Sequence, residues 1–124
     1  MDSALRKLRY RAGMRVAVLG APSGFETLLT QAREIDRLRV LGKDLDLVQA
    51  FFTRRTHLER ALEKLKASLG PKGLLWLCYP KAKALGTDLN RDIIRALAAK
   101  KGLEAVAIVA VDTVWSALRC KVVS

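Results

Sequence analysis

Continuous apolar runs alternate along the chain with stretches in which apolar residues recur at helical spacing. Three runs have the apolar character of strands buried on both faces of a sheet: residues 16–19, 74–79 and 105–111. Residues 45–52, which include Asp46 and Gln49, are predicted to form a further strand. Three stretches place leucine, isoleucine, phenylalanine or alanine three or four positions apart, as one face of a helix requires: residues 25–32, 58–69 and 89–97. Because parallel neighbouring strands need a long connection, this alternation predicts a mostly parallel sheet with right-handed helical crossovers.

Two of the predicted helices carry signals for where they begin and end. Thr56 and Glu59 have the Ser/Thr-x-x-Glu spacing of a capping box, in which each side chain binds a free backbone N–H of the first turn. Thr87–Asp88 precedes the next helical stretch, and Gly70–Pro71 and Gly102 follow the two helices. We therefore expect Thr56 and Thr87–Asp88 to cap the two helices.

The last predicted strand, residues 114–123, runs antiparallel to its predecessor because Asp112–Thr113 leaves room only for a tight turn. Along this strand Leu118 and Cys120 alternate with two basic residues. Taken alone, such alternation favours a strand at the edge of the sheet, with one face towards solvent.

These elements predict an α/β fold for one domain spanning residues 1–124. We expect a mostly parallel sheet of five strands, helices on both faces, and an antiparallel last strand. Residues 34–41 fit either a continued helix or a short strand, which would be a sixth. Residues 1–13 are expected to form a basic N-terminal helix or arm that ends at Gly13.

Positive charge is the main compositional feature of this 124-residue chain, which holds 23 lysines and arginines against 12 acidic residues, a net charge of +11. Residues 1–15 contain five basic residues and one acidic residue, and residues 71–101 contain seven and two. A basic surface attracts nucleic acids, acidic membranes and phosphorylated metabolites alike. The alternative is that these residues only keep the protein soluble.

Residues 1–8 lack the apolar segment of a secretory signal, and no stretch approaches the roughly 20 apolar residues of a membrane span. Cys78 and Cys120 lie in apolar runs, as buried reduced thiols do. We therefore expect a cytoplasmic protein without a membrane span. The small number of asparagine and glutamine residues suggests a heat-adapted source.

Several motifs resemble those of known families. The turn at residues 69–74 is similar to the Lys-Pro-Gly-Gly-like turn that precedes a strand in class I methyltransferases, and the antiparallel last strand is also a mark of that fold. Residues 20–25, 79–81 and 111–119 resemble motifs of a small bacterial family of unknown function. The resemblance implies a truncated, Rossmann-like methyltransferase fold in which the last strand lies inside the sheet. The alternation of apolar and basic residues in that strand favours an edge position, but we follow the resemblance and expect the strand to be internal.

The chain also departs from the methyltransferase pattern. The family's Gly-x-Gly-x-Gly loop is reduced to Gly20 and Gly24 with Pro22 between them, and no acidic residue ends an unambiguous second strand. In the family such a carboxylate holds the ribose hydroxyls of adenosylmethionine. These departures argue against adenosylmethionine as a ligand, and we expect no cofactor.

Ligands of open α/β sheets bind beyond the carboxyl ends of the parallel strands. The residues predicted there would form a pocket for an anionic ligand, and they are Gly20, Ser23, Gly24, Arg54, Tyr79, Lys81, Lys83, Asp112 and Trp115. In the alternative interpretation, the two aromatic residues close the core, Asp112 caps its own turn and the basic residues are solvated.

Other chemistry has no support in the sequence. His57 is the only histidine, no Cys-x-x-Cys pair is present, and neither Ser23 nor Ser116 lies in a Gly-x-Ser-x-Gly motif. We therefore predict no metal site and assign no catalytic residue.

The preferred interpretation is a non-catalytic methyltransferase-like binding or regulatory domain with an anion-attracting cleft. One alternative is an adenosylmethionine-dependent methyltransferase. The other is a nucleic-acid-binding protein that uses a basic surface, with Arg6, Lys7, Arg9, Arg11, Lys72, Lys100 and Lys101 as its contacts.

Overall fold

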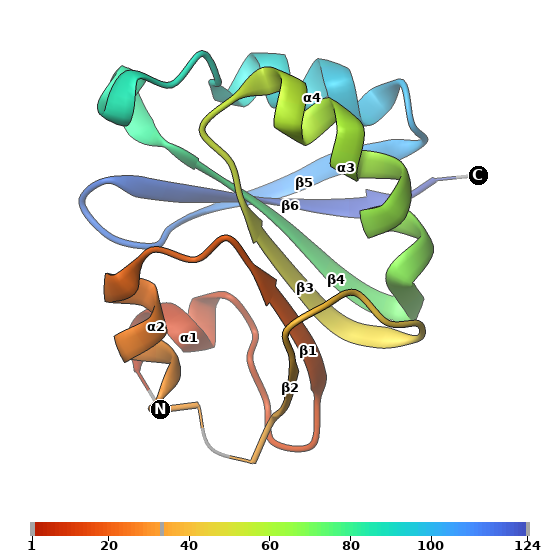
Figure 1. Ribbon diagram of the computed structural model, residues 1–124. Coiled ribbons are helices and arrows are strands. Elements are labelled where there is room, and N and C mark those ends of the chain that lie inside the picture. The colour runs from red at the N-terminus through yellow and green to blue at the C-terminus, as the bar shows by residue number, and fades with distance from the viewer. Residues whose placement is uncertain (1, 33, 124) are drawn as a thin grey trace.

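A computed structural model describes residues 2–32 and 34–123 and contains a six-stranded sheet (Figure 1). The strands are β1 (Arg15–Leu19), β2 (Asp36–Leu38), β3 (Leu45–Phe51), β4 (Leu69–Pro80), β5 (Leu103–Ala110) and β6 (Trp115–Val122). Their order across the sheet is β2-β1-β3-β4-β6-β5. Neighbouring strands from β2 to β4 are parallel, and β6 is antiparallel to both of its neighbours. The α/β prediction is therefore confirmed, and residues 34–41 contribute the sixth strand.

The last strand lies inside the sheet, as the methyltransferase resemblance implied, and not at its edge. In β6, Leu118 and Cys120 are buried, while Arg119 lies opposite Trp76 of β4 and is only partly exposed. The edge strands are β2 and β5. After the buried Leu103, the residues of β5 alternate between exposed and partly buried, and the pairing of β5 with β6 shifts between Ala105 and Ala107. The long stem of Arg119 lets a charged residue occupy an internal strand.

Helices cover both faces of the sheet. They are α1 (Ser3–Lys7), α2 (Ser23–Leu29), α3 (Arg55–Ser68) and α4 (Arg91–Ala99), and a 3-10 segment, η1 (Lys81–Gly86), follows β4. Figure 1 shows α3 and α4 on one side of the sheet and α1 and α2 on the other. Each pair of helices packs over its own cluster of buried apolar side chains, one centred on Leu62 and Leu77 and the other on Phe25 and Trp76. No helix within residues 2–32 and 34–123 is long and apolar enough to cross a membrane.

Both predicted helix caps are wrong. Helix α3 begins at Arg55 without a side-chain cap; the Arg55 backbone N–H donates to Asp88, 2.7 Å away, and Glu59 pairs with the Arg55 side chain instead of forming a capping box. Helix α4 begins after Asn90, whose side chain accepts the N–H of Ile93 at 2.8 Å. Asp88 thus caps the neighbouring helix through a contact between residues distant in sequence.

The ends of two other elements also differ from expectation. Helix α1 ends at Lys7, well before Gly13, and the chain then runs in an irregular conformation. Gly70–Pro71 follows α3 but lies within β4, where the pairing with β3 is irregular between Leu45 and Leu47.

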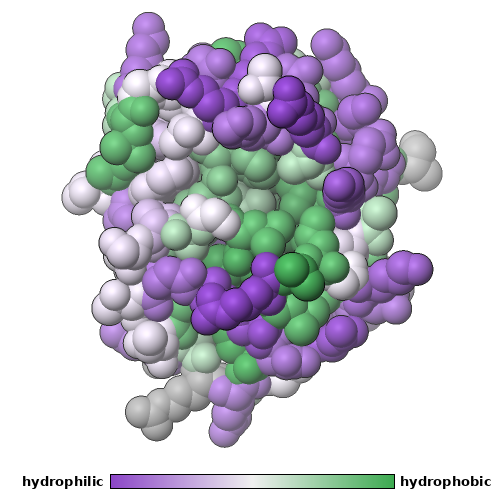
Figure 2. Space-filling model, in the orientation of Figure 1, coloured by the Kyte–Doolittle hydropathy of each residue, from purple (hydrophilic) through white to green (hydrophobic). Residues whose placement is uncertain are grey.

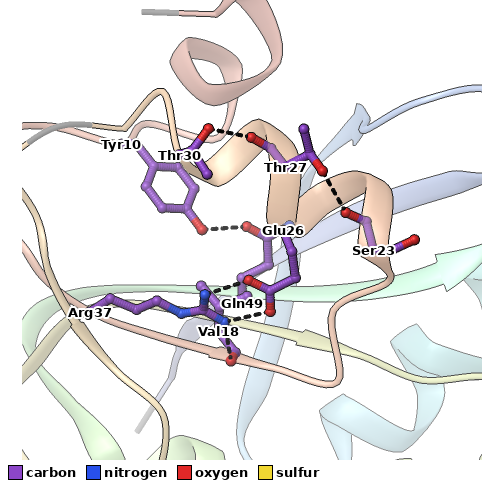
Figure 3. A network of polar contacts seen from close by, with 8 residues as sticks. All are labelled: Tyr10, Val18, Ser23, Glu26, Thr27, Thr30, Arg37 and Gln49. Atoms are coloured by element: carbon purple, nitrogen blue, oxygen red, sulfur yellow. Dashed lines mark hydrogen bonds and ion pairs between the residues drawn. The ribbon is translucent and has the colours of Figure 1, made fainter.

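Two long-range hydrogen bonds hold the segment after α1 against the sheet. The indole N–H of Trp76 donates to the carbonyl of Leu8 at 2.9 Å, and the buried Tyr10 hydroxyl donates to Oε1 of Gln49 at 2.6 Å (Figure 3). Gln49 is fully buried in β3, and its Nε2 donates to Sγ of Cys78.

Burial keeps both cysteines, Cys78 and Cys120, as neutral thiols and raises the pKa of Cys120 to about 12.

The corrected caps predict a difference between two alanine substitutions. Asn90→Ala should lower the free energy of unfolding by about 1 kcal/mol because it removes the acceptor for a first-turn N–H. Thr56→Ala, at an exposed helical position, should change it by less than about 0.5 kcal/mol. Urea denaturation measures both values, and an equal loss in the two variants would contradict the assignment.

The buried pair of Tyr10 and Gln49 predicts a strongly non-additive double-mutant cycle. Tyr10→Phe or Gln49→Leu alone should cost about 1–3 kcal/mol of stability, because each leaves the other polar group buried without this partner. The double variant should be less destabilised than the sum of the single variants, since neither polar group then remains. Additive losses in denaturant unfolding would show that the hydrogen bond contributes little.

Candidate functional site

The connections that follow β1 and β3 leave the carboxyl ends of these strands towards opposite faces of the sheet. From β1 it passes through α2 on one face to β2, and from β3 it passes through α3 on the other face to β4. β1 and β3 are adjacent, with Leu19 level with Ala50. In open α/β sheets this topological switch point is where ligands bind, in the crevice beyond the strand ends. We use the name switch-point crevice for the carboxyl ends of β1 and β3 together with the residues that follow them, Gly20 and Phe52–Arg54.

Gly20 sets how closely the turn after β1 passes the end of β3. Its φ is +68°, and a Cβ placed on it would lie 3.0 Å from the carbonyl oxygen of Phe51. Both the left-handed conformation and the short approach favour glycine. By contrast, Gly24 lies in α2 with no atom within 4 Å of the corresponding position.

Partly buried apolar side chains lie at the strand ends on the α3 side of the sheet. Leu19 is the last residue of β1, Leu38 is the last residue of β2, and Phe52 follows β3. All three pack against the apolar cluster beneath α3. Val40, just after β2, is 74% exposed. Figure 2 shows an apolar area in the middle of the viewed face, with hydrophilic side chains above and below it. An apolar surface of this kind can hold the uncharged part of a small molecule.

Two of the predicted basic residues reach across the same edge of the sheet. Arg54 Nη1 donates to the carbonyl of Gly86 at 3.2 Å, and Lys81 Nζ donates to the carbonyl of Asp112 at 2.7 Å. The Asp112 carboxylate accepts the N–H groups of Val114 and Trp115, both at 2.8 Å, and so caps its own turn. The structure thus brings Lys81 and Asp112 together, but it places the Asp112 carboxylate within the β5–β6 turn.

The predicted aromatic residues are part of the core. Trp115 is 7% exposed, and its ring packs edge-on against Phe51 with centroids 5.1 Å apart; Phe51 in turn contacts Phe25 of α2. Tyr79 is also buried, which raises the pKa of its phenol. These positions support the alternative in which the two aromatic residues close the core.

The remaining candidates occupy separate places. Ser23 and Gly24 form the start of α2, where the Ser23 carbonyl accepts the Thr27 hydroxyl. Lys83 is exposed in η1, with a φ of +61°. Within residues 2–32 and 34–123, no hydrogen bond joins residues 20–24 to Lys81 or Lys83.

One charged pair near this edge escaped the sequence analysis. Arg37 of β2 donates to both carboxylate oxygens of Glu26 in α2, with Nη2 to Oε2 at 2.8 Å, and its Nη2 also donates to the carbonyl of Val18 (Figure 3). This bond lowers the pKa of the Glu26 carboxyl. The pair and Arg39 line a groove of about 550 Å³. The only sequence signal was two opposite charges 11 positions apart, across a segment whose conformation was open.

The nucleic-acid candidates fall on two sides of the molecule. Arg6, Arg9, Arg11 and Lys72 line one groove beside α1. Lys100 and Lys101 follow α4, over the opposite face, and Lys101 pairs with Glu63 of α3 at 3.2 Å. Among the residues that the structure describes, no group of three or more histidine, cysteine or acidic side chains could hold a metal ion.

Comparison with solved structures identifies the fold as that of the class I adenosylmethionine-dependent methyltransferases. A TehB-like methyltransferase from Corynebacterium glutamicum matches 95% of this chain and 85% of its own, with a TM-score of 0.61 and 12% identity. A methyltransferase from Aquifex aeolicus matches 96% and 87%, with a TM-score of 0.62 and 13% identity. The DhpI–SAH complex matches 97% and 82%, with a TM-score of 0.64 and 10% identity. No family model and no curated protein sequence matches the chain.

These similarities correct the sequence-based argument against adenosylmethionine. Structures of adenosylmethionine-dependent methyltransferases, and one solved with SAH, share the fold along almost the whole chain. The reduced glycine motif therefore does not exclude adenosylmethionine, because the sheet and its switch point are kept although the loop motif differs. Methyltransferases that depend on adenosylmethionine have this fold.

The contrast between the two glycines near the crevice predicts opposite effects on stability. Gly20→Ala should destabilise the protein by at least about 1–2 kcal/mol, because alanine disfavours a positive φ and its Cβ would crowd Phe51. Gly24→Ala should leave stability unchanged or raise it by up to about 1 kcal/mol, since the position is helical and open. Thermal and urea unfolding measure both, and equal effects would contradict the close approach at Gly20.

Proposed function

We propose that this protein is a methyltransferase-like binding module that takes adenosylmethionine or a closely related nucleoside at the switch-point crevice. The observation that carries the proposal is the partly buried apolar surface at the carboxyl ends of β1, β2 and β3, where the direction of the chain connections reverses. This is the general location of ligands in open α/β sheets. The shared fold of known adenosylmethionine-dependent methyltransferases supports the choice of ligand.

The side chains at the crevice suit different parts of such a ligand. The turn at Gly20 lets the backbone pass close to the end of β3, and Leu19 and Phe52 offer apolar contact to the base and to the carbons next to the sulfur. The exposed guanidinium of Arg54 would pair with the carboxylate of the amino-acid part. When bound, adenosylmethionine supplies a methyl group activated by a positively charged sulfur.

One position differs from the pattern that the resemblance implied. Arg39, not a carboxylate, follows β2, and the nearby Glu26 accepts two hydrogen bonds from Arg37. The ribose hydroxyls would then donate to a remaining lone pair of Glu26 or to backbone carbonyl groups near the strand ends. The proposal is therefore one of binding, in line with a regulatory role, and it assigns no catalytic residue.

A pair of arginine substitutions tests the proposal by isothermal titration calorimetry with adenosylmethionine and SAH. Arg54→Gln should weaken binding by about tenfold or more, because it removes a charge-assisted hydrogen bond to the ligand carboxylate. Arg60→Gln, at an exposed position of α3, removes the same charge away from the strand ends and should leave the dissociation constant unchanged.

The absence of heat from either ligand at millimolar concentration would overturn the proposal. Binding that weakens equally in both arginine variants would also overturn it, because the ligand would then respond only to net charge.

A further inference from the structure

A second cationic site lies away from the strand carboxyl ends, beside α1. A groove of about 520 Å³ is lined by Arg6, Arg9, Tyr10, Arg11, Lys72 and Leu74. An adjoining groove of about 410 Å³ shares Arg11 and Lys72 with it. We call the surface formed by Arg6, Arg9, Arg11 and Lys72 the α1 basic groove. Its residues come from two segments more than 60 positions apart, so that only the fold brings their charges together.

Within residues 2–32 and 34–123, no ion pair joins Arg6, Arg9, Arg11 or Lys72 to a carboxylate. The ion pairs found there engage other basic residues: Arg15, Arg37, Arg55, Arg91, Lys101 and Lys121. Two carboxylates lie nearby in sequence or space, and both have other partners. Asp2 accepts the N–H of Ala4 as the cap of α1. Asp46 lines the adjoining groove with Arg11 and Lys72, and it accepts the N–H of Arg15.

A fifth positively charged side chain, Arg119, strengthens this local excess of positive charge. Arg119 of β6 shares a face of the sheet with Ala117, on the side that α1 covers. Its Nε is buried and has no hydrogen-bond partner among the described residues. Burial and then the charge of Arg9 lower the pKa of Arg119, so the two guanidinium groups oppose each other. A bound anion would relieve this repulsion.

The backbone presents these side chains from a fixed support. Leu8 and Tyr10 are buried. Leu8 accepts a hydrogen bond from Trp76 of β4, and Tyr10 donates one to Gln49 of β3. Arg9, between these two residues, and Arg11, after Tyr10, are exposed. Arg9 has a φ of +67°, a conformation that L side chains rarely adopt. An arginine is therefore held where glycine would be more stable, which points to a role for its side chain.

We propose that the α1 basic groove binds the phosphodiester backbone of nucleic acid without reading its sequence. Several guanidinium groups and an ammonium group along one groove match a row of phosphates better than a single anion. The aromatic ring of Tyr10 is buried and its hydroxyl is engaged, so it offers no face on which a base could stack. Binding should therefore depend on phosphate contacts and on salt.

The test measures binding of a fluorescein-labelled 20-base-pair DNA duplex by anisotropy between 50 and 200 mM salt. Four phosphate contacts predict a slope of log K against log salt of about −3.6. Arg9→Gly should reduce the magnitude of that slope by about 0.9 and weaken binding at 50 mM salt about tenfold. The same substitution should leave the melting temperature unchanged or raise it, because glycine tolerates the positive φ. If Arg9 had only a structural role, the substitution would not weaken DNA binding while leaving the melting temperature unchanged or higher.

Lys64→Ala is the matched control, since it removes one exposed charge from α3 on the opposite side of the sheet. It should leave both affinity and slope unchanged, while Lys72→Ala should behave like Arg9→Gly. Loss of affinity in Lys64→Ala equal to that in Arg9→Gly would overturn the proposal, as would the lack of a complex at 50 mM salt. Tighter binding to vesicles containing phosphatidylserine, not displaced by duplex, would assign the groove to a membrane surface instead. None of these outcomes depends on adenosylmethionine binding.

Discussion

The carboxyl edge of the sheet depends on the contact between the turn after β1 and the last residue of β3. Gly20 passes so close to the Phe51 carbonyl that no side chain fits between them without a shift. Phe51 is also the middle member of the aromatic row from Phe25 to Trp115, so the same residue holds α2 and β6 in place. Because β1 and β3 are adjacent and their connections leave on opposite faces, this contact also positions the switch-point crevice.

The order of elements could be predicted from the sequence because it depends on local periodicity and on connection lengths. The apolar runs became strands, and the internal position of β6 followed from the resemblance. Helix starts were less predictable, because Asp88 and Asn90 take partners that local spacing does not distinguish. Thr56 had the right spacing for a cap but lies inside α3. A local motif therefore did not reveal which of several polar residues the tertiary structure would use.

The candidate ligand site was predictable in its location but not in its composition. Parallel strands end at one edge, so Arg54, Lys81 and Asp112 could be assigned there from topology alone. The burial of Trp115 and the formation of the Glu26–Arg37 pair both depend on how α2 packs against the sheet. The periodicity of the sequence does not encode this packing. The influence of Arg9, in the α1 basic groove, on the neighbouring Arg119 could not be predicted without knowing that β6 lies inside the sheet.

The irregular pairing of β5 affects the tendency of the protein to associate with other copies of itself through the edge of the sheet. β5 is an outer strand with a free row of backbone groups, and Val106 and Ile108 are 37% and 48% exposed. A straight strand of this composition would be an open template for self-association. The register shift between Ala105 and Ala107 interrupts the regular pairing of β5, and Glu104 and Lys121 place an ion pair near one end of the strand. Irregular pairing and charged side chains both disfavour the addition of another strand to an edge.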